Sequence, residues 1–149
     1  ICDGVHIHPA MLRLLFRLLG EERAVAVSDA VAAAGLPEGA HEINGQIFLR
    51  RNGACYMEDG VTLAGGACDL FAQFQTLLRF GIAERAALKA CTINPARVIG
   101  AEKTIGSIAP GKQADLLLVS ARWQLEGVLL GGVLQESAAE SFHLLQPSD

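Results

Sequence analysis

The first 29 residues constrain the fold most strongly, because they alternate between extended and helical patterns. Residues 1–8 predict a short extended segment, and Pro9 then suits the first turn of a helix. The apolar residues of 11–19 recur at helical spacing, and Gly20 predicts the helix end. A buried strand is predicted over 24–27. Strand, helix and strand within about 30 residues predict a βαβ unit with neighbouring parallel strands.

The stretch 36–63 has a different pattern, in which short apolar runs alternate with turn dipeptides. The dipeptides Asn44-Gly45, Asn52-Gly53 and Asp59-Gly60 are each typical of a hairpin turn. The sequence therefore predicts a β-hairpin insertion after the second parallel strand.

Two helical stretches and a final β region complete the predicted order. Helices are expected over 69–81 and 83–100, the latter ending in a short third helix. Asp69 is the expected N-cap, Gly81 a stop, and Pro95 a break or a new start. Strands are expected over 114–119, 123–130 and 133–135, the last two separated by Gly131-Gly132.

Composition narrows the class of protein. The 149 residues are 51% hydrophobic, with a mean hydropathy of +0.33, which is enough to bury a sizeable core. A net charge of -4 without a basic stripe argues against a nucleic-acid partner. No apolar run reaches the roughly 18–20 residues of a membrane helix. The four cysteines form no CxxC pair, which predicts reduced thiols and a cytoplasmic location.

The predicted elements lack partners within the chain. Two parallel strands cannot bury this set of helices, and three terminal strands do not make a sandwich. The chain also begins at Ile1 without an initiator Met. We therefore expect it to be the C-terminal part of a longer protein.

Asp29 is the first candidate for chemistry. It follows the apolar strand 24–27, and ligands of parallel α/β folds gather at the carboxyl ends of the strands. A carboxylate at this position can be an N-cap of a following helix, a solvated loop residue or a general base.

Two further sets of residues each leave alternatives open. His6 and His8, predicted on one face of a strand, can be a core or surface pair, metal ligands or substrate-binding groups. Residues 63–66 (LAGG) can form a flexible turn or bring backbone N–H groups close to a ligand. Residues 107–115 lack the spacing of a phosphate-binding loop and predict a turn into a strand.

The order of these motifs carries a resemblance. DGVHIHP, SDA, TLAG, CTINPARVIG and GSIAPGKQADL follow one another over 1–135. In this order they resemble the amidohydrolase superfamily, and most closely its N-acetylglucosamine-6-phosphate deacetylase family.

The resemblance implies an α/β fold. Residues 1–105 would be the C-terminal portion of a (β/α)8 TIM-type barrel, comprising its last two strands and helices with the β-hairpin insertion. Residues 106–149 would supply the C-terminal strands of a small β-sandwich. Positions 1–8 would be barrel strand seven with its loop, and 24–29 strand eight.

The resemblance also implies a reaction. Asp29 would be the catalytic acid/base that deprotonates a metal-bound water and then protonates the departing amine, giving acetate and glucosamine 6-phosphate. His6 would bind the amino-sugar phosphate, and no role carries over to His8. The other substrate-binding residues implied are Asp3, Gly4, Val5, Leu63, Ala64 and Gly65.

Two departures and several expectations follow from the resemblance. The family often has Ser where this chain has Gly66, which removes a helix-capping hydroxyl. The family's metal ligands, a Glu and two His, would lie before residue 1, so a divalent ion (Zn, Fe, Co or Mn) is expected in the full-length enzyme and no ligand in this chain. The chain alone is expected to be inactive and to aggregate or pair, whereas the full-length protein is expected to be a homodimer with no nucleic-acid or membrane partner.

Two other functions compete with this interpretation. One is a different amidohydrolase, for example a dihydroorotase-like enzyme or another N-acyl-amino-sugar enzyme. The other is a non-catalytic binding or assembly domain that kept the fold.

Overall fold

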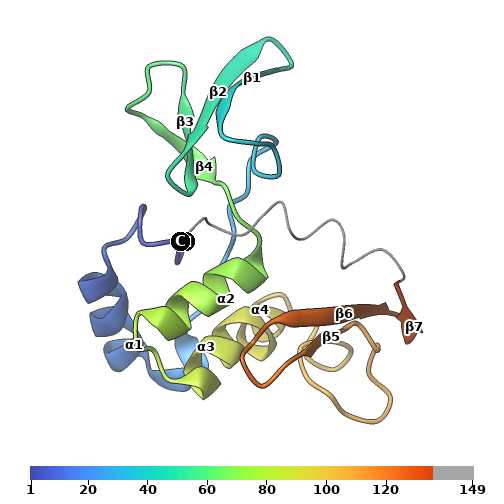
Figure 1. Ribbon diagram of the computed structural model, residues 1–149. Helices are drawn as coiled ribbons and strands as arrows, with labels where there is room; N and C mark the ends of the chain where they lie inside the picture. The colour runs from blue at the N-terminus through green and yellow to red at the C-terminus, as the bar shows by residue number, and fades with distance from the viewer. Residues whose placement is uncertain (136–149) are drawn as a thin grey trace.

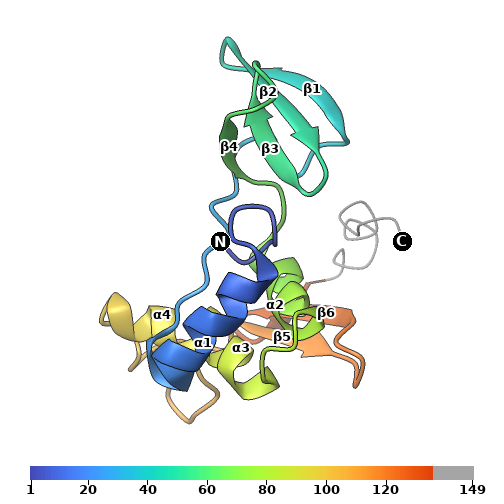
Figure 2. The same ribbon diagram turned by 90° about the vertical axis from the view of Figure 1, so that its left-hand side faces the viewer.

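The computed structural model describes residues 1–135, which form two antiparallel sheets and four helices (Figure 1). The sheet β1–β4 stands apart from the helices, and the chain passes between the two parts before β1 and again after β4. The sheet β5–β7 lies on the other side, next to the helices. A second view shows the same separation (Figure 2).

The β1–β4 sheet is an antiparallel meander in chain order. Asn44 and Gly45 have φ values of 53° and 76°, and Asn52 and Gly53 have 51° and 75°. Both turns therefore have the left-handed geometry that Asn-Gly favours, as predicted. The predicted hairpin insertion has four strands, because residues 63–66 also pair with β3. The strands are β1 (Gly39–Ile43), β2 (Gln46–Arg51), β3 (Ala54–Met57) and β4 (Leu63–Gly66).

The helices follow the predicted pattern with small shifts in their ends. Asp69 caps α2, because its Oδ1 accepts a hydrogen bond from the Ala72 N–H at 2.7 Å. Gly20 leaves the helical conformation within α1, as the stop signal predicts, and a further turn follows it. The break before the short third helix comes at Thr92 rather than Pro95. The helices are α1 (Pro9–Arg23), α2 (Leu70–Arg79), α3 (Glu84–Cys91) and α4 (Ile93–Val98).

The second sheet is antiparallel in the order β5-β6-β7. Trp123 joins it to α2: its ring meets Phe74 edge-on at 4.8 Å between centroids, and its carbonyl accepts a 2.7 Å hydrogen bond from Gln75. The assignment of this region to a sandwich over 106–149 remains a prediction, and its last 14 residues lie outside the described part. The strands are β5 (Leu116–Val119), β6 (Leu125–Leu130) and β7 (Val133–Leu134).

The two predicted parallel strands are not strands in this structure. Residues 3–7 form bends, and residues 24–28 run without a ladder into the left-handed turn at Asp29. A strand requires a hydrogen-bonded neighbour, and within the described residues the Ala26 N–H instead donates to Ala90 O, in α3, at 2.9 Å. The expectation of a wholly buried strand is also wrong, because Val25 and Val27 are 39% and 51% exposed.

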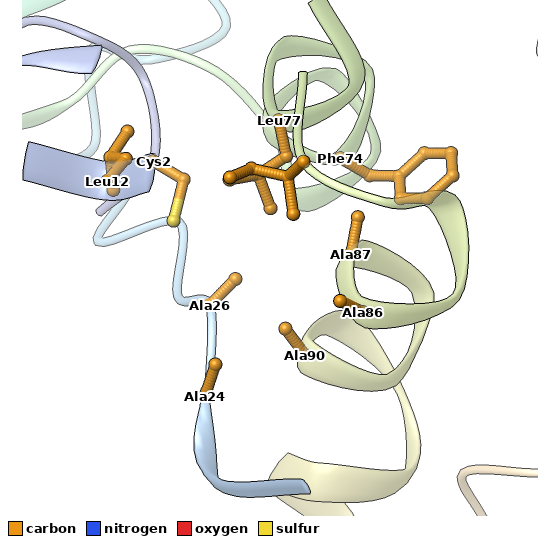
Figure 3. Close-up of a cluster of buried hydrophobic side chains, with 10 residues drawn as sticks. Cys2, Leu12, Ala24, Ala26, Phe74, Leu77, Ala86, Ala87 and Ala90 are labelled. Carbon is orange, nitrogen blue, oxygen red and sulfur yellow. The ribbon is translucent and has the colours of Figure 1, made fainter. Parts of the chain in front are cut away.

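The main core lies between the extended segment and two helices (Figure 3). Ala24 and Ala26 face small residues of α3, and Leu77 and Phe74 of α2 close the cluster. Small side chains let the backbones approach closely here, which fixes 24–28 against α2 and α3. The α3 residues are Ala86, Ala87 and Ala90, and Cys2, Leu12 and Ile82 complete the group.

A smaller core lies under the β1–β4 sheet, where the buried residues are Ala33, Cys55 and Ala67. No helix among residues 1–135 is long and apolar enough to cross a membrane.

Candidate functional site

The predicted substrate loop 3–6 is closed by the carboxylate of Asp3. Asp3 Oδ1 accepts hydrogen bonds from the N–H groups of Val5 and His6 at 2.9 and 3.0 Å, and Oδ2 lies 2.6 Å from His6 Nδ1. The Asp3 side chain is only 4% exposed. Since Nδ1 is held by Asp3, Nε2 is the ring atom that remains to meet a ligand.

The other residues of this segment have structural contacts. Gly4 has φ 82°, and a Cβ there would lie 2.7 Å from the Phe80 ring, so glycine allows the loop to rest on the end of α2. Val5 is exposed. His8 is the N-cap of α1 and its Nδ1 accepts from the Ala10 N–H at 3.2 Å, which gives it a role that the sequence left open. The prediction that His6 and His8 share a strand face is wrong, because the segment bends.

Asp29 lies at the end of the extended segment in a left-handed turn. Its φ is 48°, a conformation that costs a non-glycine residue about 1–2 kcal/mol and that Asp tolerates better than most. The residue is exposed. It caps no helix, since residues 32–35 form turns, so the N-cap alternative is wrong and the solvated-loop and general-base alternatives remain.

Two glycines of β4 hold the Asp29 turn. The Gly66 N–H donates to Asp29 O at 2.8 Å, and Gly66 O accepts from the Val31 N–H at 3.3 Å. A Cβ at Gly65 would lie 2.7 Å from Asp29 O, and one at Gly66 would lie 2.1 Å from Ser28 O. Only residues without a side chain allow this approach.

These contacts exclude one of the two interpretations of LAGG, the flexible turn. The segment is strand β4 rather than a flexible turn, because it pairs with β3 on one side and with Ala30 on the other. The Gly66 N–H is already used inside the chain. The departure at Gly66 also has a structural reason, since a Ser side chain would enter the space of the Ser28 carbonyl. The binding roles of Leu63, Ala64 and Gly65 stay predictions.

One residue that the sequence analysis missed connects the two groups. Gln73 of α2 is fully buried, its Oε1 accepts from the Cys2 N–H at 2.8 Å, and its Nε2 donates to Ser28 O at 3.1 Å. The available signal was a polar side chain on the apolar face of the helix predicted over 69–81. Within residues 1–135, the side chains of Asp29 and His6 make no hydrogen bond with each other.

The predicted site residues coincide neither with a metal-binding cluster of the described residues nor with the groove beside β5. In the described part of the chain, no group of three or more His, Cys, Asp or Glu side chains could hold a metal ion. A groove of about 800 Å³ lies between the helices and β5, lined by Phe71, Leu88 and Trp123 among others, and no predicted site residue lines it.

The cysteines next to the site are poor nucleophiles. Burial raises the pKa of the Cys2 and Cys68 thiols, which flank the site in sequence. Burial also raises the pKa of Cys91 to about 12. All four cysteines are free, in agreement with the prediction of reduced thiols, and their protonated form favours no nucleophilic role.

Comparisons with known proteins agree on one family. Residues 1–141 match the Amidohydrolase family. The N-acetylgalactosamine-6-phosphate deacetylase of Escherichia coli O157:H7 is 29% identical over 135 residues, covering 90% of this chain and 35% of that protein. The N-acetylglucosamine-6-phosphate deacetylase of Rattus norvegicus is 31% identical over 142 residues, covering 95% of this chain and 34% of that protein.

A solved structure is similar as well. The N-acetylglucosamine-6-phosphate deacetylase of Pasteurella multocida superposes with a TM-score of 0.79 at 30% identity, covering 90% of this chain and 35% of that one. The chain thus spans about a third of the length of each of these three proteins.

Proposed function

The chain belongs to the amidohydrolase family, and from this premise we propose that it carries the acid/base and part of the substrate site of an N-acetylhexosamine-6-phosphate deacetylase. Asp29 carries the proposal. It ends an extended segment in a left-handed turn, and two glycines of β4 hold that turn from a distant part of the sequence. A carboxylate held exposed in an unfavourable backbone conformation is typical of a functional residue.

Asp29 performs the proton transfers of the proposed reaction. Its carboxylate takes a proton from a water molecule, and the water oxygen attacks the carbonyl carbon of the acetamide. The C–N bond then breaks, and the carboxylic acid returns the proton to the departing nitrogen. Acetate and a free amino-sugar phosphate result. Acid/base catalysis of this kind contributes about 10²–10⁴-fold in rate.

The loop 3–6 binds the substrate through His6. Because the Asp3 carboxylate accepts from Nδ1–H, the imidazole presents Nε2 as an acceptor in a fixed orientation, which suits recognition of a substrate hydroxyl. Asp3 acts through His6 rather than on the substrate, since both of its oxygens are engaged inside the loop.

The described residues do not fit a divalent metal, so no step is assigned to one here. The expectation that metal ligands lie on another part of the full-length enzyme remains a prediction, and so does the homodimer.

Asp29→Asn tests the proposal. In the full-length enzyme we expect turnover of N-acetylglucosamine 6-phosphate to fall at least 10²-fold, while substrate affinity and metal content stay near wild type. Glu58→Gln, which removes one charge from an exposed turn, is the matched control and should leave turnover unchanged. Loss of bound metal, or unchanged turnover, would contradict the assignment of Asp29.

The relatives give a specific reason to test a second substrate. The Escherichia coli O157:H7 relative is named for the galactosamine epimer, which differs from the glucosamine form in the orientation of a single hydroxyl. Turnover of the two epimers should be compared by kcat/KM, together with dihydroorotate as the probe of the competing amidohydrolase. Turnover of dihydroorotate alone would contradict the proposed deacetylase activity. Absence of turnover with all three compounds would favour a non-catalytic domain.

A further inference from the structure

We propose that Gln73 is a positioning residue that sets the His6 loop and the Asp29 turn relative to each other. This inference rests on the proposed function, because only that function makes the His6 loop and the Asp29 turn act on the same substrate. Gln73 lies in α2, between the two segments, and its side chain is fully buried.

The two ends of one amide group reach the two segments. Oε1 accepts from the Cys2 N–H at 2.8 Å, and Cys2 directly precedes Asp3, whose carboxylate orients His6. Nε2 donates to Ser28 O at 3.1 Å, and Ser28 directly precedes Asp29. Because the donor and acceptor ends are used at once, the amide has one orientation, and it fixes the spacing of both backbones.

No ladder replaces this link. Parallel strands at these positions would bond to each other directly, but within residues 1–135 the segments 1–8 and 24–29 share no backbone hydrogen bond. A misplacement of about 1 Å between groups that act on one substrate can cost on the order of 10²-fold in rate. The Gln73 amide therefore contributes to catalysis through the position of Asp29 and not only to the core.

A merely structural role must be separated from positioning. Gln75 offers a matched control, because it lies on the same helix and its Nε2 also donates to a distant backbone carbonyl, that of Trp123, at 2.7 Å. That bond anchors the β5–β7 sheet and touches no predicted site residue. Gln75 is half-buried whereas Gln73 is fully buried, so the loss of stability is measured in both variants and compared with the loss of kcat.

The experiment compares Gln73→Glu with Gln75→Glu in the full-length enzyme. The Gln73→Glu side chain keeps the acceptor for Cys2 but can donate to Ser28 O only when it is protonated. We measure kcat and KM for N-acetylglucosamine 6-phosphate between pH 5.5 and 9, and thermal stability alongside. For Gln73→Glu, we expect kcat relative to wild type to fall about 10–100-fold as pH rises. For Gln75→Glu, the same ratio should stay flat.

A flat ratio for both variants would overturn the inference while leaving the proposed function intact. No turnover of either epimer by the wild type would overturn the proposed function and this inference with it. If Gln73→Glu does not fold, Gln73→Met replaces it, since it keeps the volume without charge. That variant should lose about 10–100-fold in kcat/KM at every pH, and wild-type values would again overturn the inference.

Discussion

The loop that carries His6 and the turn that carries Asp29 differ in where their contacts originate in the sequence. Asp3 closes the first with bonds to residues two and three positions away. The Asp29 turn is held by Gly65 and Gly66 of β4 and, through Ser28, by Gln73. The hydrogen bonds that shape the first element lie within four consecutive residues, and α2 only positions it through Phe80 and the Gln73–Cys2 bond, whereas the shape of the second requires the β1–β4 sheet to be in place. A change within residues 3–6 should therefore alter the shape of the first and a change in β4 that of the second, whereas Gln73 acts on the position of both.

The largest effect on this comparison is expected from Gly66→Ala. Its Cβ would lie 2.1 Å from Ser28 O, a backbone atom that cannot rotate away. We expect the free energy of unfolding to fall by about 2–3 kcal/mol and turnover to fall with it, as the Asp29 turn is displaced. Urea denaturation and kcat measure the two effects.

Gly35→Ala is the control for this variant. Gly35 has open space around it, so the free energy of unfolding should change by less than about 1 kcal/mol. Equal stability of the two variants would mean that β4 does not hold the Asp29 turn.

A smaller effect, limited to the His6 loop, is expected from Asp3→Asn. The Asn oxygen can still accept from the N–H groups of Val5 and His6, but its amide NH₂ would face His6 Nδ1 and move the ring proton to Nε2. We expect kcat/KM to fall about 10–100-fold, less than for His6→Ala. The nitrogen chemical shifts of the His6 ring report the change of tautomer.

Asp59→Asn is the matched control, since Asp59 accepts from N–H groups two and three residues away and from the Thr62 hydroxyl. It should leave kcat/KM unchanged. Loss of activity in both variants, or an unchanged tautomer in Asp3→Asn, would contradict the role of Asp3.

The smallest effect on stability is expected from Glu22→Gln. This change removes the exposed ion pairs of Glu22 with Lys89 and Arg97, which lie far along the chain. Hydrogen bonds from Lys89 and Arg97 lower the pKa of Glu22 to about 2. Because the pKa of Glu22 is lower in the folded state than its ordinary value of 4.5, the ionised carboxylate stabilises the folded protein above pH 4.5. This stabilisation is lost as the pH falls toward 2 and the carboxylate is protonated. The wild type and the variant should thus differ slightly near pH 7 and converge toward pH 2, by thermal melting.

High salt should reduce this difference at neutral pH, because exposed ion pairs are screened. A large loss of stability in Glu22→Gln that salt does not reduce would contradict this expectation. It would show that the contacts of Glu22 with Lys89 and Arg97 stabilise the fold strongly although they are exposed.

Much of the secondary structure could be predicted because it depends on neighbouring residues. The Asn-Gly turns require left-handed φ values, and Asp69 caps α2 with its own side chain, so both signals are readable within a few residues. The motif order likewise indicated the amidohydrolase family, since the residues that carry it lie in short consecutive stretches.

The tertiary structure decided what depends on distant neighbours. Whether 24–29 is a strand depends on a hydrogen-bonded partner, and the packing of Ala24 and Ala26 on α3 leaves Val25 and Val27 exposed. Gly66 looked like a lost cap in the sequence, but its place is set by the carbonyl of Ser28, 38 positions earlier. The closure of loop 3–6 on Asp3 replaced the extended segment that the sequence predicted over 1–8. The sequence by itself determined the presence of Asp29 at a segment end. Only the folded chain brought β4 and Gln73 to that end, because backbone groups far apart in sequence meet only through packing.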